Sequence, residues 1–148
     1  MRIALLVVMA ASAVPAFAAD EPKLEFTRLS YIDGKETKNN AFENNGAGLP
    51  VCGPENSVTF SGTVTAVGKV SIEIEVAEVS VFDPKKVIGK ATTFKPEVKD
   101  GKWSFTITPP KKGEEAVIAS GKAYHLKTTF VADGKEVPVP IHLFNVGN

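Results

Sequence analysis

The stretch Val70-Ser71-Ile72-Glu73-Ile74-Glu75-Val76 alternates apolar and polar side chains at every step. A period of two residues is typical of a β-strand that buries one face and leaves the other in water. Val and Ile, which fill the apolar positions, are also residue types that strands favour. The stretch therefore predicts a β-strand with one buried face.

The same period recurs along most of the chain and predicts an all-β fold, an antiparallel β-sandwich of about seven strands. We expect these strands at residues 24–31, 57–66, 69–82, 90–98, 102–108, 122–132 and 136–146. The apolar positions of the pattern predict a core. The residues expected to be most buried are Phe60, Ile72, Ile74, Trp103, Phe105, Leu126 and Ile141.

Two Asp-Gly pairs predict two-residue hairpin loops, because Gly adopts a positive φ readily and Asp tolerates it. A loop at Asp133-Gly134 places Phe130 opposite Val137 and Leu126 opposite Ile141. A loop at Asp100-Gly101 likewise joins the strands on its two sides into one hairpin.

Other connections leave alternatives open. The Val67-Gly68 connection suits a hairpin, but an immunoglobulin-like arrangement would send its two strands to opposite sheets. The alternation changes phase near Ala77-Glu78, which predicts a bulge or a bend.

The first 18 residues resemble an export signal. Arg2 is followed by the apolar run from Ile3 to Val14, and Ala16-Phe17-Ala18 has the small-x-small pattern of a signal-peptidase site. Residues 1–18 are therefore expected to be a cleaved signal peptide, and residues 19–148 one domain. The mature chain is predicted to be periplasmic or secreted, without a membrane span.

Composition excludes several function classes. The chain has 17 basic and 17 acidic residues and no basic cluster, so nothing in its charge favours nucleic acid. It contains no complete catalytic or cofactor motif, so we expect no enzyme activity and no cofactor. Its one cysteine, Cys52, cannot close an intramolecular disulfide; it is either a buried small apolar residue or a thiol that pairs with another chain.

Several short motifs together resemble bacterial immunoglobulin-like domains over residues 57 to 146. They are Ser61-Gly62-Thr63-Val64, Gly68, Asp100-Gly101-Lys102-Trp103-Ser104-Phe105, Gly121 with Tyr124-His125-Leu126, and Asp133-Gly134. The resemblance implies an immunoglobulin-like sandwich that serves adhesion, spacing or ligand binding. It makes Tyr124 a candidate for the tyrosine corner of such folds, with contact to a ligand as the alternative.

One segment, Asp33 to Asn56, does not fit the strand pattern and is expected to be a long loop. Phe42 and Leu49 lie among its polar residues and are the candidate binding residues, since exposed apolar side chains can anchor a partner. The alternative is a tolerated spacer, because loop length costs little closure entropy.

The expected hairpin register also places His125 directly opposite His142, the only two histidines of the chain. Cross-strand neighbours lie about 5 Å apart at Cβ, so this pair could share a Zn²⁺ or Cu²⁺ ion if a third ligand joined it. The sequence thus favours an exported, non-catalytic binding or structural module with a protein or cell-surface partner. The alternative is a periplasmic protein that binds a transition metal through the histidine pair.

Overall fold

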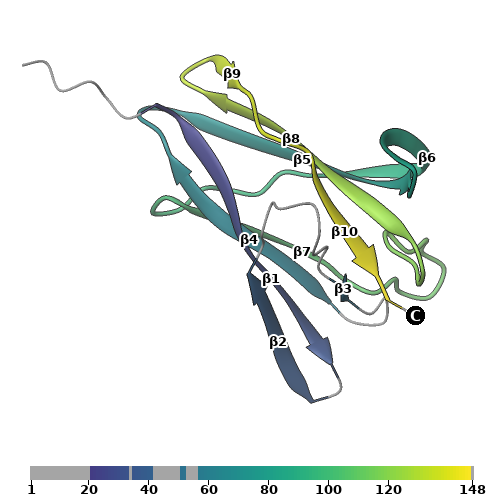
Figure 1. The fold of residues 1–148 in the computed structure, drawn as a ribbon. Helices are drawn as coiled ribbons and strands as arrows, with labels where there is room; N and C mark the ends of the chain where they lie inside the picture. Colours follow the sequence, from purple (N-terminus) through teal and green to yellow (C-terminus); the bar gives the residue numbers. More distant parts are fainter. Residues whose placement is uncertain (1–20, 34, 42–50, 53–56, 148) are drawn as a thin grey trace, which may run out of the picture.

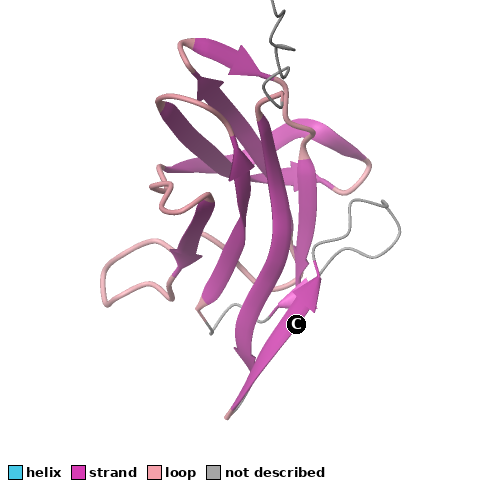
Figure 2. Cartoon of the chain, turned by 90° about the vertical axis from the view of Figure 1, so that its left-hand side faces the viewer, coloured by secondary structure: helices cyan, strands magenta, loops and turns pink. Residues whose placement is uncertain are grey.

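The computed structural model describes residues 21–33, 35–41, 51–52 and 57–147, which form ten strands and no helix. Their bounds are β1 Lys23–Asp33, β2 Glu36–Ala41, β3 Val51–Cys52, β4 Val58–Thr65, β5 Val70–Ser80, β6 Asp83–Phe94, β7 Lys102–Ile107, β8 Ala123–Ala132, β9 Lys135–Val137 and β10 His142–Val146. Figure 2 shows these strands joined by loops. No helix with the length and apolar character of a membrane span occurs in this part of the chain. The predicted signal peptide lies outside it.

The strands form two sheets that pack face to face (Figure 1). The first sheet has the order β2-β1-β4-β7, and the second has the order β3-β10-β8-β5-β6, with β9 beside β8. All pairs are antiparallel except the short pairing of β3 with β10. The all-β, antiparallel sandwich expected from the alternation is therefore confirmed.

Aromatic side chains from both sheets meet in the core. The ring of Phe60, from β4, lies 5.2 Å from that of Phe105 on β7 and 5.0 Å from that of Phe144 on β10. All residues predicted to be most buried are at most 7% exposed, with one exception. Ile141 is 37% exposed, so its predicted burial is wrong.

The connection at Val67-Gly68 does not form a hairpin. β4 lies in the first sheet and β5 in the second, so the chain crosses between sheets at this point. Gly68 has a φ of 87°, and Asp133 donates its N–H to the Lys69 carbonyl at 2.9 Å on the far side of the crossing. The alternative with the two strands in opposite sheets is the one observed.

The turn at Asp100-Gly101 forms, but the hairpin around it does not. Both residues have positive φ, and Lys99 and Lys102 exchange two backbone hydrogen bonds of 2.9 and 3.0 Å. Beyond them the strands separate, since β6 pairs with β5 and β7 pairs with β4. The predicted hairpin is wrong because an apolar alternation can face the core equally well from either sheet.

The turn at Asp133-Gly134 forms as predicted, and Phe130 pairs with Val137. Past β9, however, residues 138–141 leave the ladder, and Leu126 pairs with His142 instead of Ile141. Pro138 and Pro140 have no N–H to donate, which accounts for the interruption. The one-residue shift that follows exchanges the two faces of β10.

The segment expected to be a long loop contains paired backbone. β2 is the antiparallel partner of β1, and β3 runs parallel to β10 with Cys52 beside Val146. The expectation of an unstructured connection is therefore wrong for residues 36–41 and 51–52. Phe42 and Leu49 lie outside the described residues.

β5 has the irregularity that its phase change predicts, a register shift between Ala77 and Val79 against β6. A second register shift, between Val79 and Ser80, lies closer to the turn, so the β5–β6 hairpin is irregular near its tip. A shift of this kind bends the strand and increases its twist. β6 also begins at Asp83, well before the predicted start at residue 90.

Candidate functional site

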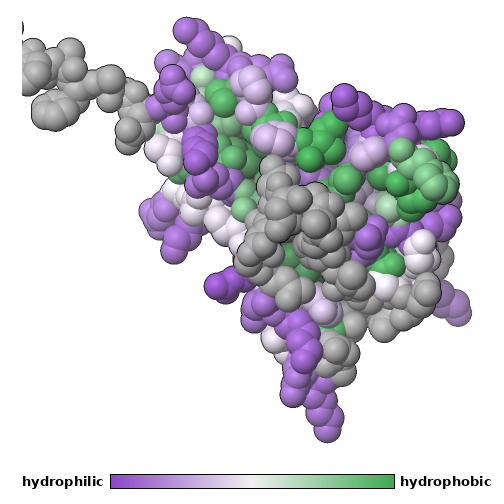
Figure 3. All heavy atoms as spheres, viewed as in Figure 1, coloured by the Kyte–Doolittle hydropathy of each residue, from purple (hydrophilic) through white to green (hydrophobic). Residues whose placement is uncertain are grey.

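The tip of the β5–β6 hairpin carries two of the three most exposed large apolar residues of the described part of the chain. Phe82 is 94% exposed and Val81 is 71% exposed, and on β6 Val87 and Ile88 are also exposed. Figure 3 shows apolar atoms gathered at this β6 end of the molecule. We call Val81 and Phe82 the hairpin tip.

Local turn chemistry does not require these two residues. Ser80 pairs with Asp83, so Val81-Phe82 forms a two-residue loop, where Asn, Asp and Gly are the usual choices. The Ser80 hydroxyl accepts the N–H of Phe82 at 3.3 Å, and the Asp83 carboxylate accepts the N–H of Lys85 at 3.1 Å. Ser80 and Asp83 thus supply the side-chain hydrogen bonds of the turn, and the side chains of Val81 and Phe82 are not needed to close it.

The hairpin rests on the outer face of the second sheet. Val79, Val81 and Pro84 line a small groove of about 170 Å³ together with Ala123, Leu143 and Asn145 from β8 and β10. Beside this groove the His125 ring is almost completely buried, at 2% exposure. Its Nε2 lies 3.0 Å from Glu75 Oε1 and its Nδ1 lies 3.4 Å from the carbonyl oxygen of Pro84. These two contacts join Pro84, at the start of β6, to Glu75 on β5 through the His125 ring.

The two histidines do not form the predicted pair. His142 is opposite Leu126, so it shares the inward side of that residue, whereas His125 is opposite Leu143 on the outer side. The ring centroid of His142 lies 4.4 Å from that of Phe26 in the core. The register that would bring the imidazoles together is therefore wrong. The described residues also contain no group of three His, Cys, Asp or Glu side chains that could hold a metal ion.

We expect His142 to make the protein less stable in mild acid. Burial lowers the pKa of His142 below its ordinary value, because the interior disfavours the charged ring. The unfolded chain then binds the proton more strongly, so the free energy of unfolding falls as the pH drops below about 6.5 and through the lowered native pKa. Urea unfolding at pH 7.5 and at pH 5 measures this loss.

The variant His142→Phe is expected to lose less stability than the native chain over the same pH interval. The carboxylates contribute equally to the pH dependence of stability in both proteins. The difference between the two losses of unfolding free energy therefore measures the contribution of His142. An identical loss in both proteins would contradict the assignment.

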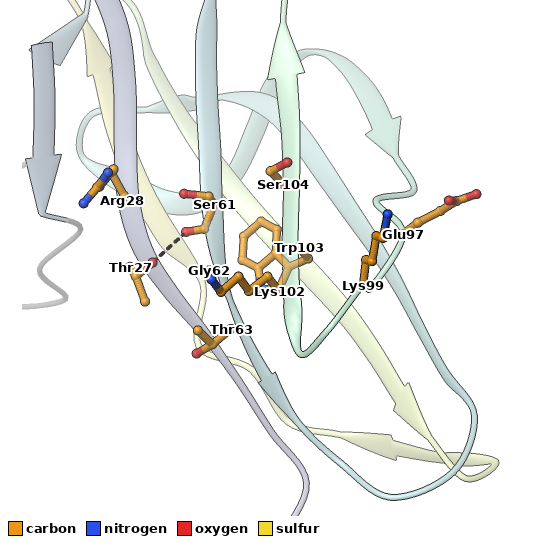
Figure 4. A pocket seen from close by; sticks show the side chains of 10 residues that line it. All are labelled: Thr27, Arg28, Ser61, Gly62, Thr63, Glu97, Lys99, Lys102, Trp103 and Ser104. Carbon is orange, nitrogen blue, oxygen red and sulfur yellow. Dashed lines mark hydrogen bonds between the residues drawn. The ribbon is translucent and has the colours of Figure 1, made fainter. Parts of the chain in front are cut away.

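A polar groove of about 560 Å³ crosses the first sheet at β4 and β7 (Figure 4). The hydroxyl side chains of Thr27, Ser61, Thr63 and Ser104 line it, and Thr27 Oγ1 donates to the Ser61 carbonyl at 3.3 Å. Its charged lining residues are three bases, Arg28, Lys99 and Lys102, and one carboxylate, that of Glu97. The lining contains no histidine or cysteine, so it offers no Ser–His or Cys–His pair.

The acidic side chains of β5 have separate partners. Glu73 pairs with Lys95 at 2.7 Å, Glu78 pairs with Lys122 at 2.8 Å, and Glu75 contacts His125. A carboxylate acid–base pair would need two of them directed at one substrate. Their separate pairing is consistent with a solubilising role.

Sequence reasoning did not identify the hairpin tip as a site, although a signal was present. Val81-Phe82 breaks the alternation of β5 and stands next to Asp83-Pro84, a pair typical of turns. Two large apolar residues in a turn are unusual, and this pattern could have indicated a contact surface.

Comparison of the chain with protein-family models and with curated proteins gave no match.

Proposed function

We propose that this protein is an exported, non-catalytic module with an immunoglobulin-like sandwich, and that it acts by binding a protein partner. The support for export is the pattern of residues 1–18, namely Arg2, an apolar run and a small-x-small cleavage site. Two observations support a role without catalysis. The three carboxylates of β5 each have a different partner, and the two histidines lie on opposite sides of their sheet.

Strand order supports the immunoglobulin-like part of the proposal. In such folds the first, second and fifth core strands share one sheet, and the third, sixth and seventh share the other. Here β1, β4 and β7 lie in one sheet and β5, β8 and β10 in the other. Tyr124 adds a second feature, because its hydroxyl accepts the N–H of Ala119 at 2.8 Å, five residues upstream. This is the contact of a tyrosine corner.

The exposed hairpin tip is the observation that carries the binding role. A Phe side chain that moves from water into an apolar site contributes about 1.5–3 kcal/mol. The tip is also held in place by the turn hydrogen bonds and by His125 beneath Pro84, so little conformational freedom is lost on binding. A few such aromatic residues commonly supply most of the affinity of an interface.

Site-specific photo-cross-linking in the native host tests the proposal. A photoreactive phenylalanine analogue at position 82 is expected to give a covalent adduct with a partner in the exported fraction. The same analogue at Ser104, an exposed position on β7 in the other sheet, serves as the matched control. Adducts of equal yield from both positions, or none from position 82, would contradict binding through the hairpin tip.

A further inference from the structure

A second apolar feature lies at the opposite end of the sandwich. A groove of about 470 Å³ lies where β1 begins and β8 turns into β9, and we call it the distal groove. Its apolar lining is Pro22, Val67, Ala132, Val137 and Pro138. Val67 is 72% exposed, so an apolar side chain of another molecule can reach it. The volume falls within the range of about 300–1,000 Å³ that is usual for binding pockets.

Strand β5 connects the distal groove to the hairpin tip. Its first residue, Val70, pairs with Ala132 at the groove, and its last residue, Ser80, precedes the tip. An 11-residue strand spans about 33 Å at roughly 3.3 Å per residue. In Figure 1 the two regions accordingly lie at opposite sides of the molecule, the groove near β9 and the tip near β6. A chain therefore cannot insert its own tip into its own groove.

The charges around the two features are of opposite sign. Glu21, Asp133 and Glu136 contribute three carboxylates to the groove against the single base Lys135. Next to the tip, Lys85 and Lys86 are both exposed and outnumber Asp83. Opposite charges around two apolar surfaces favour their association and fix their orientation.

We infer that the partner of the hairpin tip is a second copy of this chain, which receives Val81 and Phe82 in its distal groove. This inference rests on the binding role proposed above and specifies the partner. The contact joins two different surfaces, so each bound copy still presents one free tip and one free groove. Repetition of such a contact extends an assembly head to tail instead of closing it into a two-fold dimer.

The reciprocal arrangement makes a mixing experiment possible. Phe82→Ser removes the tip and retains the groove, whereas Val67→Lys places a positive charge in the groove and retains the tip. Both residues are highly exposed, so neither substitution removes a buried contact of the fold. Ser104→Lys, which adds the same charge at an exposed position of β7 in the other sheet, is the matched control.

Sedimentation velocity of the purified mature chain over a wide concentration range provides the measurement. The native chain and Ser104→Lys are expected to form species that grow with concentration. Phe82→Ser and Val67→Lys are each expected to weaken self-association by about tenfold or more. An equimolar mixture of these two variants is expected to form a heterodimer and to stop there, because only one intact tip–groove contact can form.

Other results would overturn the inference. They are a native chain that stays monomeric at every concentration, an association that neither variant weakens, or a mixture of the two variants that does not pair. Binding to vesicles of anionic lipid that Phe82→Ser abolishes, without self-association, would replace the second copy with a lipid surface.

Cross-linking separates this inference from the proposed function. An adduct of position 82 with an unrelated protein would leave the binding role standing and refute the second copy. An adduct with the mass of two chains, mapped to the distal groove, supports both. No adduct from position 82 would refute both.

Discussion

Replacement of Gly62 by alanine is expected to lower the free energy of unfolding by about 3 kcal/mol or more. Gly62 lies on β4 opposite Trp103, with its α-carbon facing the core. The added Cβ would meet the carbonyl oxygen of Glu25 and would lie 2.7 Å from Cζ2 of Trp103. The first neighbour is backbone beside a register shift of β1, and the second is a ring that is 2% exposed. Neither can move away at low cost.

The Trp103 ring is further held by Phe26, whose ring centroid is 4.7 Å away in an edge-to-face contact. The clash at Gly62 therefore spreads into the core instead of being absorbed by one flexible side chain. Chemical denaturation of Gly62→Ala against the native chain measures the effect, with Ser61→Ala on the outer face of the same strand as the control. A loss at Gly62 no larger than at Ser61 would show that β1 and Trp103 can rearrange.

Replacement of Phe60 by alanine is expected to cost about 3–5 kcal/mol. The Phe60 side chain is completely buried, and its ring contacts Phe105 within its own sheet and Phe144 in the opposite one. The substitution leaves a cavity at the point where the two sheets meet, and the surrounding aromatic rings lose contacts that they cannot replace. Stabilities of natural domains are about 5–15 kcal/mol, so this loss is a large share.

The same substitution at the hairpin tip provides a direct comparison. Phe82→Ala removes the same atoms at a position that is 94% exposed, and its expected effect on the free energy of unfolding is within about 0.5 kcal/mol. Urea unfolding curves of the two variants, measured on the monomer at low concentration, test the contrast. Similar losses from both would mean that Phe82 supports the fold and is not reserved for a partner.

The candidate site was only partly accessible to sequence reasoning. The register of the last hairpin was extrapolated from Asp133-Gly134 through Pro138 and Pro140, and the ladder breaks at these residues. The predicted histidine pair depends on that register, and the observed one-residue shift places the two histidines on opposite sides of the sheet. His125 instead contacts Glu75 and Pro84, which come from parts of the chain 50 and 41 residues away. A local sequence pattern cannot predict contacts between segments so far apart in the chain.

The alternation of apolar and polar residues by itself determined that the described part of the chain is all-β, and that Phe60, Trp103 and Leu126 belong to the core. It also determined the buried side of most strands, with β10 as the exception. Asp-Gly chemistry also determined two turns, because a positive φ is a property of the residues themselves. The partner of each strand was decided only by the tertiary structure. An inward-facing side chain looks the same in sequence whichever sheet carries it, whereas the choice of sheet depends on hydrogen bonds and packing between distant segments. For this reason β4 and β5, and likewise β6 and β7, are neighbours in sequence but lie in opposite sheets.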